Sequence, residues 1–320
     1  MLAAWGWVGI GLVLTFGGAE AFVRAAASIA ARLGVPPLII GLTIVAWGTS
    51  APELVVSTIA TLNGQGGIAV GNVVGSNIFN IAAIVGLAAL VYPMRVHAQL
   101  IRLDIPIMIG ISLLLAGLLL DGAISRVDAA IFFVGMAAYT AFSFRAGAAQ
   151  PPPEVQAEFA QGNPPQHRHL AIDLALFIAG LTMLVGGSRA LVTGAVIIAQ
   201  HLGVSETVIG LTIVAAGTSL PELATSAVAA LRKQPDIAIG NVVGSNIFNV
   251  LGILGIAGLV APMQAPDLSR LDLGAMLVFA VLLFPLARSG FVVKRWEGAL
   301  LLAGYGLYLW LMWPTAPASP

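Results

Sequence analysis

The chain has 320 residues, of which 59% are hydrophobic and only 9% are charged, whereas about 25% of the residues in an ordinary soluble domain are charged. So few charged groups cannot cover a water-soluble protein of this size, and the composition predicts an integral membrane protein whose apolar surface faces lipid. The absence of cysteine excludes disulfides and thiolate metal sites, and 14 basic against 14 acidic residues leave no basic surface for nucleic acid.

Ten apolar runs are long enough for membrane-spanning helices, each of which needs about 20 residues. The first is expected to be a structural helix and not a cleavable targeting segment, because it lacks the basic flank of such a segment. The Pro-rich polar stretch 146–169 predicts a linker. In chain order, the expected spans are 4–31, 37–62, 67–92, 101–120, 127–145, 170–200, 207–231, 237–261, 271–288 and 296–313.

The two halves of the chain are copies of one another. Residues 41–94 align with 210–263 without a gap at an offset of 169, and 35 of the 54 aligned positions are identical. Each copy holds five runs, and because five is odd, the second copy must cross the membrane in the opposite direction to the first. The sequence therefore predicts an all-α integral membrane protein with ten transmembrane helices in two inverted five-helix repeats, at 1–145 and 170–320, an architecture typical of secondary transporters.

Lys and Arg predict the orientation of the chain, because cytoplasmic loops carry more of them. With ten spans, eleven basic residues fall on one side and three on the other. We therefore expect a protein of the cytoplasmic (inner) membrane, with the linker in the cytoplasm and both termini extracytoplasmic. The eleven are Arg24, Arg32, Arg95, Arg102, Arg145, Arg168, Arg232, Lys233, Arg288, Lys294 and Arg295, and the three are Arg126, Arg189 and Arg270.

Glu53 and Glu222 are the only charged residues in the second, third, seventh and eighth runs, and they are equivalent in the repeat. Because a charge at the middle of the membrane costs roughly 2.5–3.5 kcal/mol on insertion scales, we interpret both as functional residues. The alternative is a structural hydrogen bond between helices. It is disfavoured because no Lys or Arg on these four runs compensates the two carboxylates.

Oxygen-bearing residues accompany each glutamate. Gly-Thr-Ser-Ala-Pro-Glu stands at 48–53, and its copy at 217–222 is Gly-Thr-Ser-Leu-Pro-Glu. On a continuous helix Thr49 and Ser50 would share the face of Glu53. The proline removes one amide donor and so helps to leave a backbone carbonyl unpaired.

A second motif, Gly-Asn-Val-Val-Gly-Ser-Asn-Ile-Phe-Asn, occurs unchanged at 71–80 and 240–249. Its glycines fit close helix packing. In each copy the serine and the last asparagine are four residues apart and share a helix face, where they can present neutral oxygens beside the glutamates; these are Ser76 with Asn80 and Ser245 with Asn249. The other asparagines can be ligands, caps or bridges between broken helices, and we favour a scaffold role for them: Asn72, Asn77, Asn241 and Asn246.

Carboxylates, hydroxyls, amide oxygens and freed carbonyls form an all-oxygen ligand set that suits hard cations such as Ca²⁺ or Na⁺. Transition metals favour imidazole, but the four histidines fall near predicted helix ends or in the linker. No cofactor is expected, and an enzyme is disfavoured because no histidine neighbours Ser50 or Ser219 in sequence. The expected partners are the transported ions and the lipid bilayer, without an obligatory protein partner.

The paired motifs resemble the α-repeats of the cation/calcium exchanger superfamily, especially prokaryotic sodium/calcium exchangers, and the resemblance covers the whole ten-helix plan. It implies a secondary active antiporter in which Ca²⁺ and several Na⁺ compete for a central site. It also implies alternating access, produced when the first and sixth helices slide across the other eight. The resemblance assigns the central site to Glu53, Glu222, Asn80 and Asn249, with the backbone oxygens of Thr49 and Thr218. Flanking Na⁺ positions would use Ala46, Thr49, Ser50 and Ser76 on one side, and Ala215, Thr218, Ser219 and Ser245 on the other.

One position departs from the resemblance, because several relatives have Asp where this chain has Asn249. Two carboxylates neutralise one Ca²⁺ but not three Na⁺. The leading hypothesis is a Na⁺/Ca²⁺ antiporter that extrudes Ca²⁺. A H⁺/Ca²⁺ antiporter remains the alternative, because burial disfavours the charged form of Glu53 or Glu222 and so favours protonation. A cation channel lined by the same carboxylates is a weaker alternative.

Overall fold

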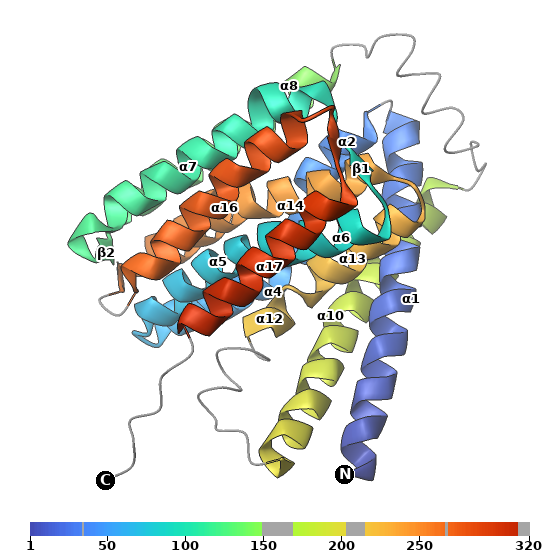
Figure 1. Cartoon of the computed structure of the whole chain (residues 1–320), viewed down its shortest axis with the longest axis horizontal. Helices are drawn as coiled ribbons and strands as arrows, with labels where there is room; N and C mark the ends of the chain where they lie inside the picture. Colours follow the sequence, from blue (N-terminus) through green and yellow to red (C-terminus); the bar gives the residue numbers. More distant parts are fainter. Residues whose placement is uncertain (34, 149–168, 203–214, 266–267, 313–320) are drawn as a thin grey trace.

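The computed structural model describes residues 1–33, 35–148, 169–202, 215–265 and 268–312, which are almost entirely helical (Figure 1). In chain order the elements are α1 Leu2–Leu33, α2 Pro37–Ile40, η1 Gly41–Val45, α3 Ala46–Thr49, α4 Ala51–Leu62, α5 Gly66–Phe79, η2 Asn80–Val85, α6 Gly86–Val91, β1 Met94–Arg95, η3 Leu100–Asp104, α7 Ile105–Leu118, η4 Leu119–Asp121, β2 Ala123–Ile124, α8 Arg126–Ala148, α10 Leu170–His201, α12 Ala215–Thr218, α13 Leu220–Leu231, α14 Pro235–Phe248, η6 Asn249–Leu254, α15 Gly255–Val260, β3 Met263–Gln264, α16 Arg270–Arg288, β4 Val292–Val293 and α17 Arg295–Met312.

Within the described ranges, seven helical segments are long and apolar enough to cross a membrane, and Leu38–Thr49 with Ala51–Leu62, bent by 46°, forms an eighth. The shorter α13 and α17 occupy the places of the two remaining predicted spans, at an offset of 169 from α4 and α8. Where residues are described, the predicted runs agree with the helices to within three residues. Helix α8 continues to Ala148, so the first three residues of the predicted linker are helical, and 149–168 lie outside the described residues.

Four two-residue strands reflect the inversion of the two halves. Strand β1 pairs antiparallel with β4, and β2 pairs antiparallel with β3. At the offset of 169, β1 corresponds to β3 and β2 to β4, so exchanging the halves converts one pair into the other. One span, η3 with α7, separates β1 from β2, and the two pairs therefore lie at opposite ends of the helix bundle (Figure 1).

Burial distinguishes central from peripheral helices. Most residues of α5–α6 and α14–α15 are buried, whereas only 22–33% of the residues are buried in the apolar windows of α1, α7, α8, α10 and α16. The exposed positions of the peripheral helices include large apolar side chains such as Val13, Val134 and Val278. This apolar exterior is the surface that lipid covers, and the second motif of each half lies on the central helices.

Helices α1 and α10 form a closely packed antiparallel pair beside the other helices (Figure 1). A Cβ atom on Gly18 would lie 2.7 Å from the backbone nitrogen of Leu184, and one on Gly180 would lie 2.7 Å from the backbone nitrogen of Phe22. Glycine at these positions lets the two backbones touch directly. The two helices are therefore packed as one unit.

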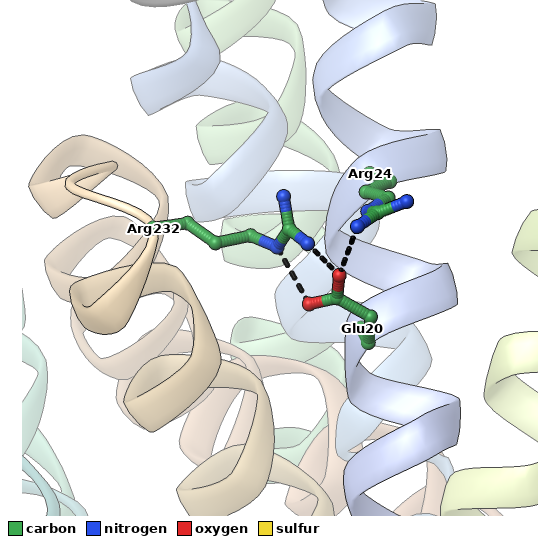
Figure 2. Close-up of polar contacts among 3 residues, drawn as sticks. All are labelled: Glu20, Arg24 and Arg232. Carbon is green, nitrogen blue, oxygen red and sulfur yellow. Dashed lines mark hydrogen bonds and ion pairs between the residues drawn. The ribbon is translucent and has the colours of Figure 1, made fainter.

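Two polar contacts of α1 differ in what they join. The buried carboxylate of Asp173, on α10, accepts hydrogen bonds from Ser28 at 2.7 Å and from Arg32 at 2.8 Å, and so ties α1 to α10. Glu20 instead pairs with Arg232, the residue after α13 (Figure 2). The first contact lies within the α1–α10 pair, and the second joins that pair to the rest of the bundle.

Candidate functional site

Two helix breaks at equivalent positions place the two glutamates. The helix is interrupted at Ser50, with φ −83° and ψ 8°, and at Ser219, with φ −89° and ψ 10°. The next helix in each half has proline near its start, where the missing amide hydrogen costs nothing. Glu53 and Glu222 therefore occupy the first turns of α4 and α13, where the helix dipole favours negative charge.

The serines at the breaks bond to the glutamate of the opposite half. Ser50 Oγ donates to Glu222 Oε1 at 2.7 Å, and Ser219 Oγ donates to Glu53 Oε1 at 3.0 Å. Ser76 Oγ lies 3.0 Å from Ser219 Oγ. On a continuous helix Ser50 would share the face of Glu53, but the helix is interrupted at Ser50, and its hydroxyl donates to the glutamate of the other half. Ser219 thus lies beside Ser76 and Glu53 of the other half.

The threonines also make contacts across the two halves. Thr49 Oγ1 donates to Asn241 Oδ1 at 3.1 Å, and Thr218 Oγ1 donates to Asn72 Oδ1 at 3.4 Å. Each of these asparagines donates in turn to a serine on the helix that carries the glutamate of its own half, at 3.0 Å. Asn72 and Asn241 therefore link the helix breaks to α4 and α13, which agrees with the scaffold role favoured for them.

Asn80 and Asn249 each begin a π-helical turn, η2 and η6. Such turns are rare and occur frequently at functional sites. The side-chain nitrogen of Asn80 donates to Asn246 Oδ1, and that of Asn249 donates to Asn77 Oδ1, both at 3.0 Å. The side-chain oxygens of Asn80 and Asn249 are buried and accept no hydrogen bond.

Four buried oxygens without a hydrogen-bond partner come from the four residues of the expected central site: Glu53 Oε2, Glu222 Oε2, Asn80 Oδ1 and Asn249 Oδ1. The elements that carry them pack across the halves, α4 against η6 and α13 against η2. An unpaired buried acceptor costs about 1–3 kcal/mol, and more when it is charged. Among the described residues, neither glutamate pairs with Lys, Arg or His. A bound cation would satisfy such oxygens, and so would a proton on a glutamate, since a protonated carboxyl can donate to an amide oxygen.

The remaining predicted residues are two serines, which differ in their hydrogen bonds, and two alanines at equivalent helix starts. Ser245 Oγ is buried without a partner, whereas its equivalent, Ser76, lies beside Ser219. Ala46 is buried at the start of α3, and Ala215 begins the equivalent helix α12. The serines therefore make the two halves of the site unequal in their hydrogen bonds.

A second pair of equivalent carboxylates was not predicted. Tyr139 donates to Asp104 at 3.0 Å, and Tyr308 donates to Asp272 at 2.8 Å. The tyrosines are 169 residues apart but the aspartates are 168 apart, so a gapless comparison of the halves does not align the aspartates. Allowing one gap would have revealed the pair. Gln99 completes the contacts of Asp104, and these carboxylates therefore join helices and do not present open oxygens.

An inverted repeat of membrane helices is an architecture typical of secondary transporters. The chain belongs to the sodium/calcium exchanger protein family, whose sequence profile matches residues 3–145 and 172–313. It is therefore a membrane antiporter, and no catalytic activity is indicated by its relatives, which are transporters.

Individual relatives match nearly the full length of the chain. It is 36% identical over 327 residues to the inner membrane protein YrbG of Escherichia coli (strain K12), covering 99% of each chain. It is 32% identical over 334 residues to the sodium/calcium exchanger MaX1 of Methanosarcina acetivorans, covering 94% of this chain and 95% of the relative. The sodium-calcium exchanger NCX_Mj, soaked with 2.5 mM Na⁺ and 0.1 mM Ca²⁺, superposes with a TM-score of 0.84 at 31% identity, covering 98% of this chain and 99% of that chain.

Proposed function

We propose that this chain exchanges Na⁺ for Ca²⁺ across the cytoplasmic membrane by alternating access at one central site. The observation that carries the proposal is the set of four buried, unpartnered oxygens from Glu53, Glu222, Asn80 and Asn249. Carboxylate and amide oxygens are ligands that Ca²⁺ prefers. Two carboxylates supply the charge that neutralises one Ca²⁺.

The flanking hydroxyls and backbone oxygens are the proposed Na⁺ ligands. They come from Ala46, Thr49, Ser50 and Ser76 in the first half and from Ala215, Thr218, Ser219 and Ser245 in the second. The hydrogen bonds that cross between the halves support a shared cluster around both glutamates and not two separate groups. In this proposal Na⁺ displaces Ca²⁺ because both ions use the same glutamates.

We further propose that the first repeat is 1–145, that the cytoplasmic linker begins near 146 and ends at 169, and that the second repeat is 170–320. Both termini would be extracytoplasmic, and the β1–β4 pair would lie at the cytoplasmic end. The distribution of Lys and Arg supports this orientation. The printed name of YrbG, an inner membrane protein, supports the same membrane.

The moving part in this proposal is the α1–α10 pair. Its backbone-to-backbone packing at Gly18 and Gly180 and the buried Asp173–Arg32 contact support movement as one unit. Sliding of that unit across the bundle would open the central site to one side of the membrane at a time.

The test is uptake of radiolabelled Ca²⁺ into proteoliposomes that contain the purified full chain. Uptake driven by an outward Na⁺ gradient at equal pH on both sides supports the proposal. Uptake that does not depend on the Na⁺ gradient but depends on a pH gradient would show that H⁺, and not Na⁺, is the coupling ion. Single-channel currents far above the turnover of a carrier would favour a channel.

Voltage dependence then tests the stoichiometry. If three Na⁺ exchange for one Ca²⁺, one net charge crosses in each cycle, and the membrane potential contributes about 2.3 kcal/mol per 100 mV. Ca²⁺ uptake should therefore respond to an imposed potential in the direction of net charge movement. Uptake that is independent of the potential would indicate an electroneutral exchange.

A further inference from the structure

The amides of Asn80 and Asn249 leave their oxygens, and not their NH₂ groups, without a hydrogen-bond partner. Both amide oxygens are buried without a donor, while Glu53 Oε2 and Glu222 Oε2 are buried without a donor as well. An amide NH₂ turned toward a carboxylate would make a charge-assisted hydrogen bond. Glu53 and Asn249 lie on the packed elements α4 and η6, and Glu222 and Asn80 lie on the packed elements α13 and η2, so the direction of these amides decides whether an oxygen or an NH₂ group is available there.

This direction is set by a second pair of asparagines outside the four-residue site. Asn80 Nδ2 donates to Asn246 Oδ1, and Asn249 Nδ2 donates to Asn77 Oδ1, each at 3.0 Å. Rotating Asn80 or Asn249 by half a turn would place one amide oxygen against another. The inner amides can therefore rotate only if Asn77 and Asn246 rotate with them.

Asn77 and Asn246 cannot rotate, because each donates to the backbone carbonyl of the other. The distances are 3.2 Å from Asn77 Nδ2 to Asn246 O and 3.3 Å from Asn246 Nδ2 to Asn77 O. A backbone carbonyl accepts hydrogen bonds and never donates them. Both side chains are also buried, at 1% and 2% exposure, so water is not an alternative partner. Two backbone carbonyls thus fix the direction of four amides.

We propose that Asn77 and Asn246 are positioning residues that hold the amide oxygens of Asn249 and Asn80 toward the transported cation. The inference rests on the proposed function, in which Asn80 and Asn249 are cation ligands. Each positioning residue serves the ligand of the opposite half, since Asn77 orients Asn249 and Asn246 orients Asn80. The relay keeps both amides from donating to the glutamates, and the neutral oxygens stay in place before the cation arrives.

A double-mutant cycle tests this role, because a carboxylate has two equivalent oxygens and needs no orientation. Asn77→Ala should weaken Ca²⁺ binding to the purified full chain about 10- to 100-fold, the range seen when residues that support metal ligands are removed. In an Asn249→Asp background the same substitution should have little effect or should strengthen binding. The measurement is equilibrium binding of radiolabelled Ca²⁺. An equal loss in both backgrounds overturns the proposal.

The repeat supplies matched controls within the same protein. Asn246→Ala should couple to Asn80→Asp in the same manner, and this mirror cycle decides the matter if Asn77→Ala does not fold. The mismatched combinations, Asn77→Ala with Asn80→Asp and Asn246→Ala with Asn249→Asp, should be additive. Equal coupling in matched and mismatched cycles would mean that the loss comes from general damage to the core, and it would also overturn the proposal.

Glu53→Gln and Glu222→Gln in the same binding assay separate this inference from the site assignment. If both variants bind Ca²⁺ as the wild type does, the central site is wrong and the positioning role falls with it. If both lose binding while the matched cycles are additive, the central site stands and only the positioning role is overturned.

Discussion

Glu20 on α1 and Arg232 after α13 form a two-atom ion pair (Figure 2). Arg232 Nε donates to Glu20 Oε2 at 2.6 Å, and its Nη2 contacts Oε1 of the same carboxylate. Arg24, one turn further along α1, contacts that carboxylate at 2.6 Å. The two partners are about one third exposed, so water weakens the pair without removing it. The pair joins the α1–α10 unit to the helix that carries Glu222.

Breaking this pair should shift the position of α1 relative to α13. A partly exposed ion pair contributes about 0.2–1 kcal/mol, so Glu20→Gln or Arg232→Gln should change the population of the present arrangement by at most about fivefold. Because the chain has no cysteine, spin labels on two introduced cysteines can report the distance between α1 and α13 without background.

Arg24→Gln is the control for the same carboxylate, because it leaves the Glu20–Arg232 contact in place. The distance distribution of this variant should stay close to that of the unmodified chain. Identical distributions for all three variants would show that the ion pair does not hold α1 against α13.

Removing either central carboxylate should abolish Ca²⁺ transport. Loss of one partner of a buried charged contact costs about 2–5 kcal/mol, so Glu53→Gln and Glu222→Gln should each weaken Ca²⁺ binding by about 30-fold or more. Ca²⁺ uptake by proteoliposomes is the measurement.

Glu297→Gln is a matched control, since Glu297 is equally buried but accepts a hydrogen bond from the Lys294 backbone at 2.7 Å and takes no part in the site. It should keep transport. Near-normal uptake by both site variants, with all proteins monodisperse after purification, would refute the site assignment.

The sequence was sufficient to predict the helices and to nominate candidate site residues, but not the contacts among them. The 169-residue offset identified the pairs Glu53 with Glu222 and Asn80 with Asn249, because the two copies are still identical at most aligned positions. The crossed bond from Ser50 to Glu222 could not be read from helical spacing, since it depends on a 46° bend. It also depends on how the halves dock, which no single half encodes.

Asparagine side chains mark a second limit of prediction. Helical spacing separated Asn80 from the asparagines given a scaffold role, but it did not predict their contacts: Asn80 presents an open oxygen, while Asn77 has its polar groups engaged by Asn246 and Asn249. Their difference arises where η2 and η6 begin, because the π-helical turns change the direction of successive side chains. A regular helical period does not anticipate such turns.

Asn249→Asp should strengthen Ca²⁺ binding and make it more dependent on pH. The added carboxylate raises the formal charge of the site from two to three negative charges, which favours a divalent cation. Binding must then compete with protons for a third acid, so affinity should fall more steeply as the pH falls. Binding isotherms for both proteins across a pH series give the comparison, and parallel pH profiles would show that position 249 does not contact the ion.

Close packing of α1 on α10 leads to a prediction about adjacent glycines. A Cβ atom on Gly187 would lie 2.6 Å from the backbone nitrogen of Thr15, whereas one on Gly186 would meet no atom within 4 Å. Gly187→Ala should therefore force the helices apart and lower stability by about 1–3 kcal/mol, the usual cost of overpacking. Gly186→Ala should be neutral or slightly stabilising, because alanine is the better helix former by about 1 kcal/mol.

Thermal unfolding of the two variants in the same detergent separates the effects, since helix propensity changes equally at both positions and only the contact with Thr15 differs. Equal melting temperatures would mean that α1 and α10 are not held at this distance in the membrane protein, and the idea that they move as one unit would lose its basis.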